Sequence, residues 1–313
     1  MANVVLCGWI GCSGSLWLYS FLSAVNRESR ISPLCYLSSG ARWITPRDLL
    51  YLTMKPNQIA IVLSCSDREE ESIQLAQRLD LPLVSSREEL TAECKFYIAY
   101  GAEGLSLCMT GKAAPGPVRV DFSDPRLQYR IGDATKSQGI VKAVGLKGSK
   151  HPAILDATAG MGKDAFLLAS LGCRVHMLER SAVVHALLED GLQRARVDLD
   201  KHSIVSRLSL EHGEFGADLQ CDSKVDVIYL DPMFPDHTKS ARVKKNMFVL
   251  QKLLAGEQQN EKLLVQALNC ARKRVVVKRA KTAPHLTAIT PDIEFKGSSS
   301  RYDVYLTSKG ASD

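Results

Sequence analysis

Apolar and polar positions alternate with two different periods along the second half of the chain. Short apolar runs predict buried strands, and longer segments with apolar residues three or four positions apart predict amphipathic helices. The strand-like runs are AILDAT, RVHMLE, LSLEH, VDVIYLDP, RVVVKR and YDVYLT, and the helix-like segments are KDAFLLASL, SAVVHALLEDGLQRA, VKKNMFVLQKLL and EKLLVQALNCARK. This alternation predicts an α/β domain with a doubly wound, mostly parallel sheet covered by helices on both faces.

The preceding residues are organised differently. Residues 54–122 hold one helix-like segment, SDREEESIQLAQRLD, and several strand-like runs, NQIAIVLS, LPLVSS, KFYIAY, LSLCMT and VRVDF. We therefore predict a small N-terminal α/β subdomain at 54–122 and a main domain at 123–313. Residues 1–53 show poor periodicity and precede a second methionine, Met54. They are interpreted as an uncertain N-terminal extension, with a possible start at Met54.

Composition narrows the class of protein. The 313-residue chain is 45% hydrophobic and 24% charged, which is ordinary for a folded soluble protein, and its net charge of +6 permits an anionic partner without requiring one. Its nine cysteines include no Cys-x-x-Cys pair and no zinc-ligand spacing. We expect reduced thiols in a cytoplasmic protein without a metal site. Since no apolar run approaches the roughly 20 residues of a membrane span, we expect no membrane association.

The loop LDATAGMGKD follows the first strand of the main domain. Gly160 and Gly162 would let the backbone turn sharply and approach a ligand, and the N-terminus of the next helix adds unpaired N–H groups. The alternative is a tight turn that needs glycine for steric reasons alone. The loop matches neither the G-x-G-x-x-G dinucleotide motif nor a P-loop. On its own it indicates only a candidate pocket.

An acidic residue at the end of the next strand sharpens this interpretation. Glu179 lies about 20 residues beyond the glycines, where a carboxylate can accept both ribose hydroxyls of an adenosine group. Its alternative role is to stabilise the N-terminus of the following helix. Both NAD(P) and S-adenosylmethionine (SAM) are bound by this arrangement, so the cofactor stays open at this point.

The sequence DPMF directly follows the longest apolar strand. Asp231 and the backbone carbonyl of Pro232 offer two hydrogen-bond acceptors for an exocyclic amino group, and Phe234 can stack on a base. The alternative is an ordinary turn at the end of a strand, which does not account for the aromatic residue. The stretch therefore predicts methylation of an amino group.

DPMF resembles the [DNS]-P-P-[YFW] motif of class I SAM-dependent methyltransferases, with Met233 in place of the second proline. A closer resemblance is carried by DATAGMGKDAFLLASLGCRVHMLER, VIYLDPMFP, KSARVKK, RVVVKR, QGIVKAVGLKG and RYDVYLT. These segments together resemble the RsmJ family of 16S ribosomal RNA guanine-N2 methyltransferases over about residues 94–307. The resemblance implies a class I methyltransferase Rossmann-like sheet, mostly parallel with an antiparallel C-terminal strand.

The resemblance also implies an activity, a cofactor and a set of residues. The expected reaction is SAM-dependent methylation of N2 of guanine 1516 in 16S rRNA. Lys163 replaces the usual arginine, and Glu214 with Phe215 replaces small hydroxyl residues, which puts the adenine-side contact in doubt. The expected catalytic residues are Asp231, Pro232 and Phe234, and the expected SAM-binding residues are Asp156, Gly160, Gly162, Lys163, Asp164, Glu179, Arg180, Glu214, Phe215 and Asp231.

A basic segment follows DPMF, where it would border the substrate. Its Lys239, Arg242, Lys244 and Lys245 are expected to contact RNA phosphates, the alternative being a solvated face. The expected partner is 16S rRNA or the small ribosomal subunit, and the oligomeric state stays open. Two other classes also remain: an amino-group methyltransferase acting on another nucleic acid, protein or small molecule, and a non-catalytic RNA-binding or dehydrogenase-like Rossmann protein.

Overall fold

The computed structural model describes residues 6–10, 16–20, 58–133, 138–148, 150–216, 225–232, 245–254, 262–298 and 300–307. The chain divides into two units, Met1–Lys55 and Pro56–Asp313. In the first unit, β1 (Leu6–Ile10) and β2 (Leu16–Ser20) pair as antiparallel strands. The second unit contains both other sheets and every residue discussed below.

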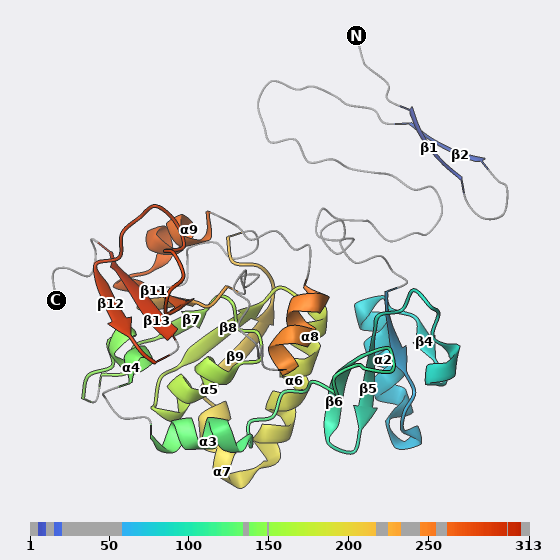
Figure 1. The fold of residues 1–313 in the computed structure, drawn as a ribbon, viewed down its shortest axis with the longest axis horizontal. Coiled ribbons are helices and arrows are strands. Elements are labelled where there is room, and N and C mark those ends of the chain that lie inside the picture. Colours follow the sequence, from blue (N-terminus) through green and yellow to red (C-terminus); the bar gives the residue numbers. More distant parts are fainter. Residues whose placement is uncertain are drawn as a thin grey trace. The chain divides into compact units, whose positions relative to one another are not determined.

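The main domain is built on a seven-stranded sheet (Figure 1). Its strands are β7 (Ile154–Asp156), β8 (Val175–Glu179), β9 (Leu208–His212), β10 (Val227–Leu230), β11 (Arg274–Ala280), β12 (Ile293–Lys296) and β13 (Ser300–Leu306). The order is β12-β13-β11-β10-β7-β8-β9. The five strands from β9 to β11 are parallel, and β13 and β12 continue the sheet in antiparallel fashion. This confirms the predicted doubly wound sheet with an antiparallel C-terminal strand.

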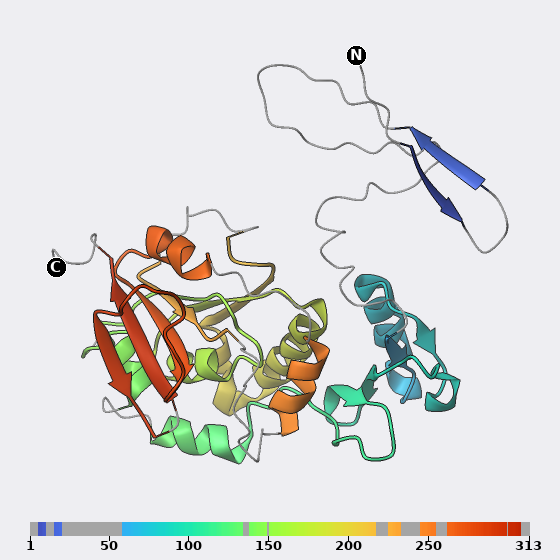
Figure 2. The same ribbon diagram turned by 45° about the horizontal axis from the view of Figure 1, so that its top comes forward.

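Helices cover both faces of this sheet (Figure 2). On one face, α9 (Leu263–Cys270) packs into a core with Ile228, Val275 and Val277. On the other face lies α5 (Lys163–Ser170), whose side chains are almost all buried. The remaining helices are α3 (Pro125–Gly132), α4 (Gly139–Ala143), α6 (Ala182–Val197), α7 (Leu199–Val205) and α8 (Lys245–Leu253). Burial on both sides explains why the central strand β10 is apolar at every position.

The predicted N-terminal subdomain is a four-stranded sheet with order β4-β3-β5-β6. β3 (Ile59–Val62) is parallel to β4 (Leu83–Val84) and β5 (Phe96–Gly101), and β6 (Gly104–Met109) is antiparallel to β5. A 3-10 turn leads into α2 (Glu69–Leu79), which packs on β3 and β4.

Hydrogen bonds connect this subdomain to α6. The Leu105 N–H in β6 donates to Asp190 Oδ2 at 3.1 Å, and Arg194 Nη2 donates to the Val120 carbonyl at 2.6 Å. Gly191 lets the two surfaces approach closely, since a Cβ there would lie 2.4 Å from Val120 Cγ1. The subdomain and the α6 face of the main domain are therefore in direct contact.

The structure differs from the sequence prediction in several places, among them α3 and α7, which were not predicted. VRVDF is not a strand, because only Val118 forms a bridge, to Leu107. β12 was not predicted, since its residues alternate between exposed and half-buried without a strong apolar face. Cys65, Cys94, Cys108 and Cys173 are free as expected, but Cys270 is disulfide-bonded. The spacing of the cysteines carries no signal for that bond.

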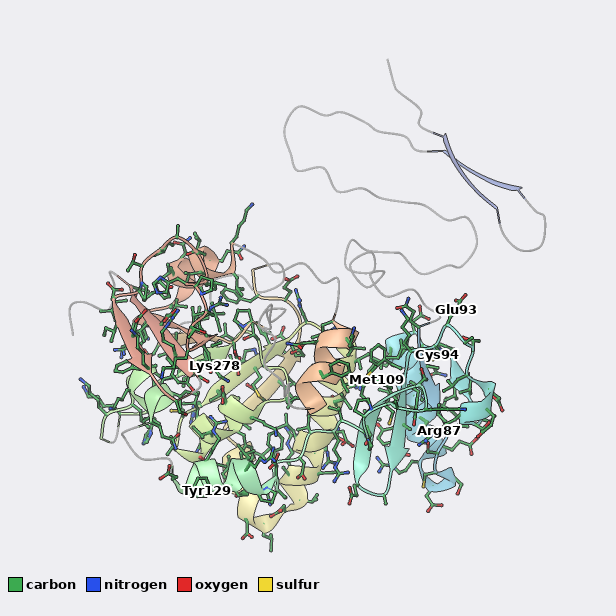
Figure 3. All side chains as sticks on the ribbon, viewed as in Figure 1. Arg87, Glu93, Cys94, Met109, Tyr129 and Lys278 are labelled. Atoms are coloured by element: carbon green, nitrogen blue, oxygen red, sulfur yellow. The ribbon has the colours of Figure 1, made fainter. Side chains whose placement is uncertain are left out.

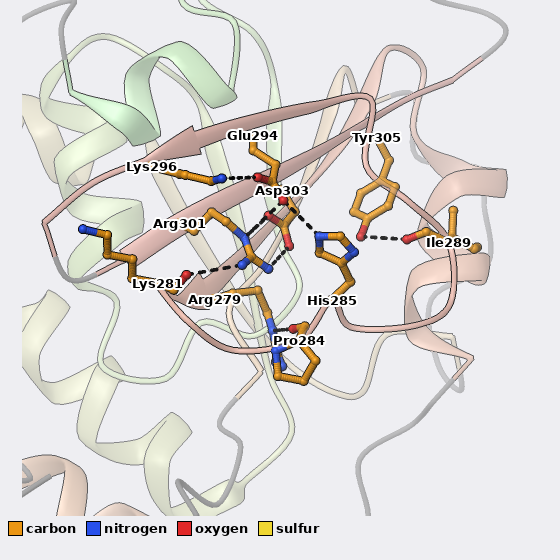
Figure 4. A network of polar contacts seen from close by, with 10 residues as sticks. All are labelled: Arg279, Lys281, Pro284, His285, Ile289, Glu294, Lys296, Arg301, Asp303 and Tyr305. Atoms are coloured by element: carbon orange, nitrogen blue, oxygen red, sulfur yellow. Dashed lines mark hydrogen bonds and ion pairs between the residues drawn. The ribbon is translucent and has the colours of Figure 1, made fainter. Parts of the chain in front are cut away.

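A network of polar side chains lies at the end of β11 and along the β12–β13 hairpin (Figure 4). Arg301 Nε and Nη2 donate to the two carboxylate oxygens of Asp303 at 2.6 and 2.9 Å, and both side chains are buried. Arg301 Nη1 also donates to the Lys281 carbonyl at 3.3 Å, and His285 Nε2 lies 2.9 Å from Glu294 Oε1. The network thus ties the segment between β11 and β12 to the hairpin.

No helix in the part of the chain that the structure describes combines the length and the apolar character needed to cross a membrane.

Candidate active site

The glycine loop lies between the carboxyl end of β7 and the first turn of α5. Gly160 and Gly162 have φ values of +53° and +67°, a region that side chains with a Cβ rarely adopt. A Cβ on Gly162 would lie 2.6 Å from Leu188 Cδ1, whereas a Cβ on Gly160 would meet nothing closer than the Thr158 carbonyl at 3.9 Å. Gly162 is therefore required by packing, and Gly160 borders open space beside the loop.

Glu179 connects this loop to the end of β8. Its carboxylate is almost fully buried, and its two oxygens accept hydrogen bonds from the Gly160 N–H and the Ser181 N–H, each at 2.8 Å. The same residue thus fixes the glycine loop and the first turn of α6. A carboxylate oxygen has two acceptor positions, so a carboxylate is a suitable acceptor for ligand hydroxyls.

Asp231 lies where β10 ends, next to the glycine loop. Its backbone N–H donates to Thr158 Oγ1 at 2.6 Å, which joins the ends of β7 and β10. Its side chain is 40% exposed, and Pro232 is also partly exposed. Phe234 and Met233 lie outside the described residues. The carboxylate of Asp231 is therefore presented at the carboxyl ends of β7 and β10. From these two neighbouring strands the chain continues to opposite sides of the sheet, to β8 and to β11, and α/β sheets bind ligands at such a position.

Lys278 in β11 bridges two carboxylates at this edge. Its Nζ lies 2.7 Å from Asp164 Oδ2 and 2.8 Å from Asp231 Oδ2. Asp164 is buried in the first turn of α5, where it also accepts from Tyr229 Oη at 2.7 Å and from Arg130 Nη2 at 2.9 Å. Figure 3 labels Lys278 within the main domain, on the strand next to β10. Four elements, α3, α5, β10 and β11, therefore meet at one group of charges.

The charges of this group depend on each other. Burial opposes ionisation of Asp164, but the Lys278 and Arg130 cations outweigh it and hold the pKa of Asp164 well below its ordinary value. Loss of hydration raises the pKa of Asp231, while Lys278 acts in the opposite direction. Burial would lower the pKa of Lys278, but the two carboxylates raise it above the ordinary value. The two carboxylates therefore favour the charged form of Lys278.

Two other expected SAM-binding residues are ordered by neighbours near the glycine loop. Asp156 is buried at the end of β7, which raises the pKa of its carboxyl to about 8, and it accepts a hydrogen bond from the Thr158 N–H at 3.2 Å. Lys163 Nζ lies 2.9 Å from Asp124 Oδ2, so it is paired with the residue that caps α3. Direct contact of Asp156 and Lys163 with a cofactor therefore stays a prediction.

The expected contacts after β8 and β9 also lie close together. Arg180 Nη1 is 3.6 Å from Glu214 Oε1, at the same edge of the sheet as Glu179. Phe215 is buried in the core with Leu178 and Ile228, so only its backbone could face a ligand. The expected RNA contacts cannot be placed: Lys239, Arg242 and Lys244 lie outside the described residues, and the structure describes only the backbone of Lys245, at the start of α8.

Comparison with known proteins assigns the fold to a family. A family model described as putative SAM-dependent methyltransferase matches residues 74–307. The ribosomal RNA small subunit methyltransferase J of Thioalkalivibrio sulfidiphilus is 41% identical over 258 residues, covering 81% of this chain and 100% of that protein. The chain belongs to the ribosomal RNA small subunit methyltransferase J family.

A second relative and a solved structure give a consistent result. The Pseudomonas syringae methyltransferase J is 44% identical over 254 residues, covering 78% of this chain and 91% of that protein. The crystal structure of a SAM-dependent methyltransferase from Neisseria gonorrhoeae has a TM-score of 0.62 and 33% identity, covering 81% of this chain and 97% of the other. The protein is therefore a SAM-dependent methyltransferase, as the resemblance implied.

The described residues of this methyltransferase fit SAM. Gly160 leaves open space beside a backbone turn, and Glu179 offers acceptors at the tip of β8. Asp164, Glu179 and Asp231 bring three carboxylates to this edge of the sheet. Carboxylates suit the sulfonium and the ammonium group of SAM.

Sequence reasoning about this methyltransferase missed Lys278 as a site residue. It lies in RVVVKR, which was predicted only to form a strand. The signal that identifies it is the register of the two strands. Val277 in β11 pairs with Leu230 in β10, so the next residue of β11, Lys278, lies beside Asp231. Arg130 had no such signal, because it comes from α3, a helix outside the predicted alternation.

Proposed function

We propose that this chain transfers a methyl group from SAM to the exocyclic N2 of a guanine in 16S rRNA. Support for the substrate comes from the curated relatives, which are named as methyltransferases of small subunit ribosomal RNA. The observation that carries the chemistry is Asp231, a carboxylate presented at the end of β10 beside the glycine loop and followed by Pro232. An acceptor pair at this place suits an amino group better than a hydroxyl or a carbon centre.

The guanine amine requires help, because its lone pair is delocalised into the ring. Asp231 and the Pro232 carbonyl would each accept a hydrogen bond from one of its two N–H groups. These hydrogen bonds would draw the nitrogen toward tetrahedral geometry, which exposes the lone pair. Positioning of this kind supplies much of the reduction of the barrier. The proton that the nitrogen releases would pass to Asp231, and SAM supplies the electrophilic methyl group. Phe234 would stack on the base once it has left its helix, which contributes about 1–3 kcal/mol.

The cofactor would be held at the carboxyl ends of β7, β8 and β9. We assign the methionine side to Gly160, Gly162, Lys163 and Asp164, and the ribose to Glu179. Because Arg130, Tyr229 and Lys278 already donate to Asp164, its carboxylate would act mainly by organising the first turn of α5. Asp156, Arg180, Glu214 and the backbone of Phe215 would complete the site.

Replacing Glu179 by glutamine is expected to weaken SAM binding by about tenfold to a hundredfold, the range for loss of a hydrogen bond to a charged acceptor. The amide keeps the size of the side chain, but its NH₂ group would face either the Gly160 N–H or the Ser181 N–H. Isothermal titration calorimetry with SAM measures the change. Glu211→Gln is the matched control, because that carboxylate is half-exposed on β9 and contacts His176. An equal effect of both substitutions would contradict the assignment.

The basic segment after DPMF is proposed to bind rRNA phosphates through Lys239, Arg242, Lys244 and Lys245. We expect the double charge reversal Lys244→Glu and Lys245→Glu to weaken rRNA binding and to reduce the slope of log K against log salt by about 0.7 for each lost contact. Filter binding over a salt series measures both quantities. Exposed Lys112→Glu in the N-terminal subdomain serves as a control for the change in net charge. An unchanged slope in the double variant would refute the assignment.

The function itself is tested on rRNA from a strain that lacks this gene. Mass mapping is expected to show the loss of one N2-methylguanine from 16S rRNA and its return when the wild-type gene is supplied. An intact N2-methylguanine pattern would exclude the proposed substrate and favour an amino-group methyltransferase with another target. A small-subunit rRNA substrate also places the proposed site of action in the cytoplasm.

A further inference from the structure

Lys278 is the direct link between the buried anchor of the site and its exposed carboxylate. Asp164 has 9% of its side chain exposed, Lys278 has 24% and Asp231 has 40%, so the three form a path from the core to the surface. The inner end is fixed, because Arg130 and Tyr229 hold Asp164 from α3 and β10. The outer end faces the position where the substrate amine is proposed to bind.

We propose that Lys278 is a positioning residue for methyl transfer, which holds Asp231 Oδ2 against the Asp164 anchor and leaves Oδ1 to accept from the substrate amine. This inference rests on the proposed function, because it assigns Asp231 to the amine. A carboxylate at the end of a strand can rotate about its side-chain bonds, and a single fixed oxygen removes most of that freedom. Misplacement of a reacting group by about 1 Å can cost about a hundredfold in rate.

The same contact keeps Asp231 in the form that accepts hydrogen bonds. The groups around it are Asp164 on α5, Asp156 on β7, Tyr229 on β10, Tyr302 on β13, Arg130 on α3 and Lys278 with Arg279 on β11. Two of these are carboxyl groups, and Lys278 is the cation in contact with Asp231. Removing it would leave Asp231 facing Asp164 without that cation, so the pKa of Asp231 would rise.

The experiment compares wild type with Lys278→Met, Lys278→Gln and Lys278→Arg. Lys273→Met is the matched control, because Lys273 directly precedes the same strand but pairs with Asp226 at its other end. Glutamine keeps a hydrogen-bond donor without the charge, so it replaces methionine if that variant does not fold. Urea unfolding establishes which variants are folded before any other measurement.

The first readout needs no substrate. Carbon-13 NMR of aspartate-labelled protein, with Asp231→Asn to identify the signal, follows the ionisation of Asp231 with pH. We expect the pKa of Asp231 to be higher in the methionine and glutamine variants than in wild type, and to stay at the wild-type value in Lys278→Arg and Lys273→Met. An unchanged pKa in Lys278→Gln would overturn the electrostatic part of the proposal.

The second readout is methylation of small-subunit rRNA. We expect kcat to fall about a hundredfold in Lys278→Gln, the acid limb of its pH profile to move to higher pH, the KM for SAM to change little, and Lys278→Arg to recover part of kcat. Wild-type kcat with an unshifted profile in Lys278→Gln would refute the positioning role. If wild type itself does not methylate rRNA, the proposed function fails, and the NMR titration alone decides whether Lys278 orders Asp231.

Discussion

Replacing Asp231 by alanine is expected to reduce the kcat of methyl transfer by about a hundredfold to a thousandfold, the usual effect of removing one preorganised polar group from an active site. The substitution removes an acceptor for the substrate amine and leaves Lys278 paired with Asp164 alone. The dissociation constant of SAM should rise by no more than about tenfold, which is the effect of one ordinary hydrogen bond. Single-turnover methylation of small-subunit rRNA, together with calorimetry for SAM, separates the two effects.

Asp231→Asn is the informative companion to the alanine variant. Asparagine keeps one carbonyl acceptor, so we expect a kcat between those of wild type and Asp231→Ala. Its backbone N–H can still donate to Thr158 Oγ1, so the junction between β7 and β10 should be preserved. A kcat of Asp231→Ala within about threefold of the wild-type value would show that Asp231 does not contact the reacting amine. The loss of even one neutral hydrogen bond is expected to change the rate by about threefold.

The parts of the site that the sequence predicted are those encoded by local pattern. A strand, a glycine loop and a helix follow one another in LDATAGMGKD, so the place of Gly160 and Gly162 could be deduced from neighbours in the chain. Glu179 and Asp231 were predicted in the same way, since Glu179 ends β8 and Asp231 directly follows β10. Parallel strands bring their carboxyl ends to one edge, and this rule places all three segments together without knowledge of their contacts.

The parts that were missed depend on long-range contacts. Lys278 reaches Asp164 across 114 positions of the chain and Asp231 across 47. Its role requires the register of β10 against β11, which the pattern of apolar residues does not specify because β10 is buried at every position and β11 has a continuous apolar run, Val275–Val277. Arg130 reaches Asp164 from α3, a short helix with a single buried residue, Leu127, and the predicted alternation of strands and helices did not include this helix. The domain boundaries at 53 and 122 remain predictions.

Replacing Asp303 by alanine is expected to lower the free energy of unfolding by about 3–5 kcal/mol, the cost of leaving one partner of a buried ion pair without the other. Asp303 is fully buried and Arg301 nearly so, and two hydrogen bonds of 2.6 and 2.9 Å join them. The other contacts of the Arg301 guanidinium in the wild-type structure are longer, with the Lys281 carbonyl at 3.3 Å and the Glu294 carboxylate at 3.6 Å, so they would compensate only in part. Urea unfolding followed by circular dichroism measures the loss.

Two controls distinguish the buried pair from charge in general. Lys296→Ala removes an ion pair with Glu294 whose lysine is 63% exposed, and should cost less than about 1 kcal/mol. The double substitution Arg301→Met with Asp303→Leu removes both charges together, so it should recover most of the stability that Asp303→Ala loses. Because the hairpin of β12 and β13 pairs with β11, the strand that carries Lys278, unfolding of the hairpin should also reduce methyl transfer. A double variant as unstable as Asp303→Ala would mean that the packing of the Asp303 side chain, and not the charge left on Arg301, determines the loss of stability.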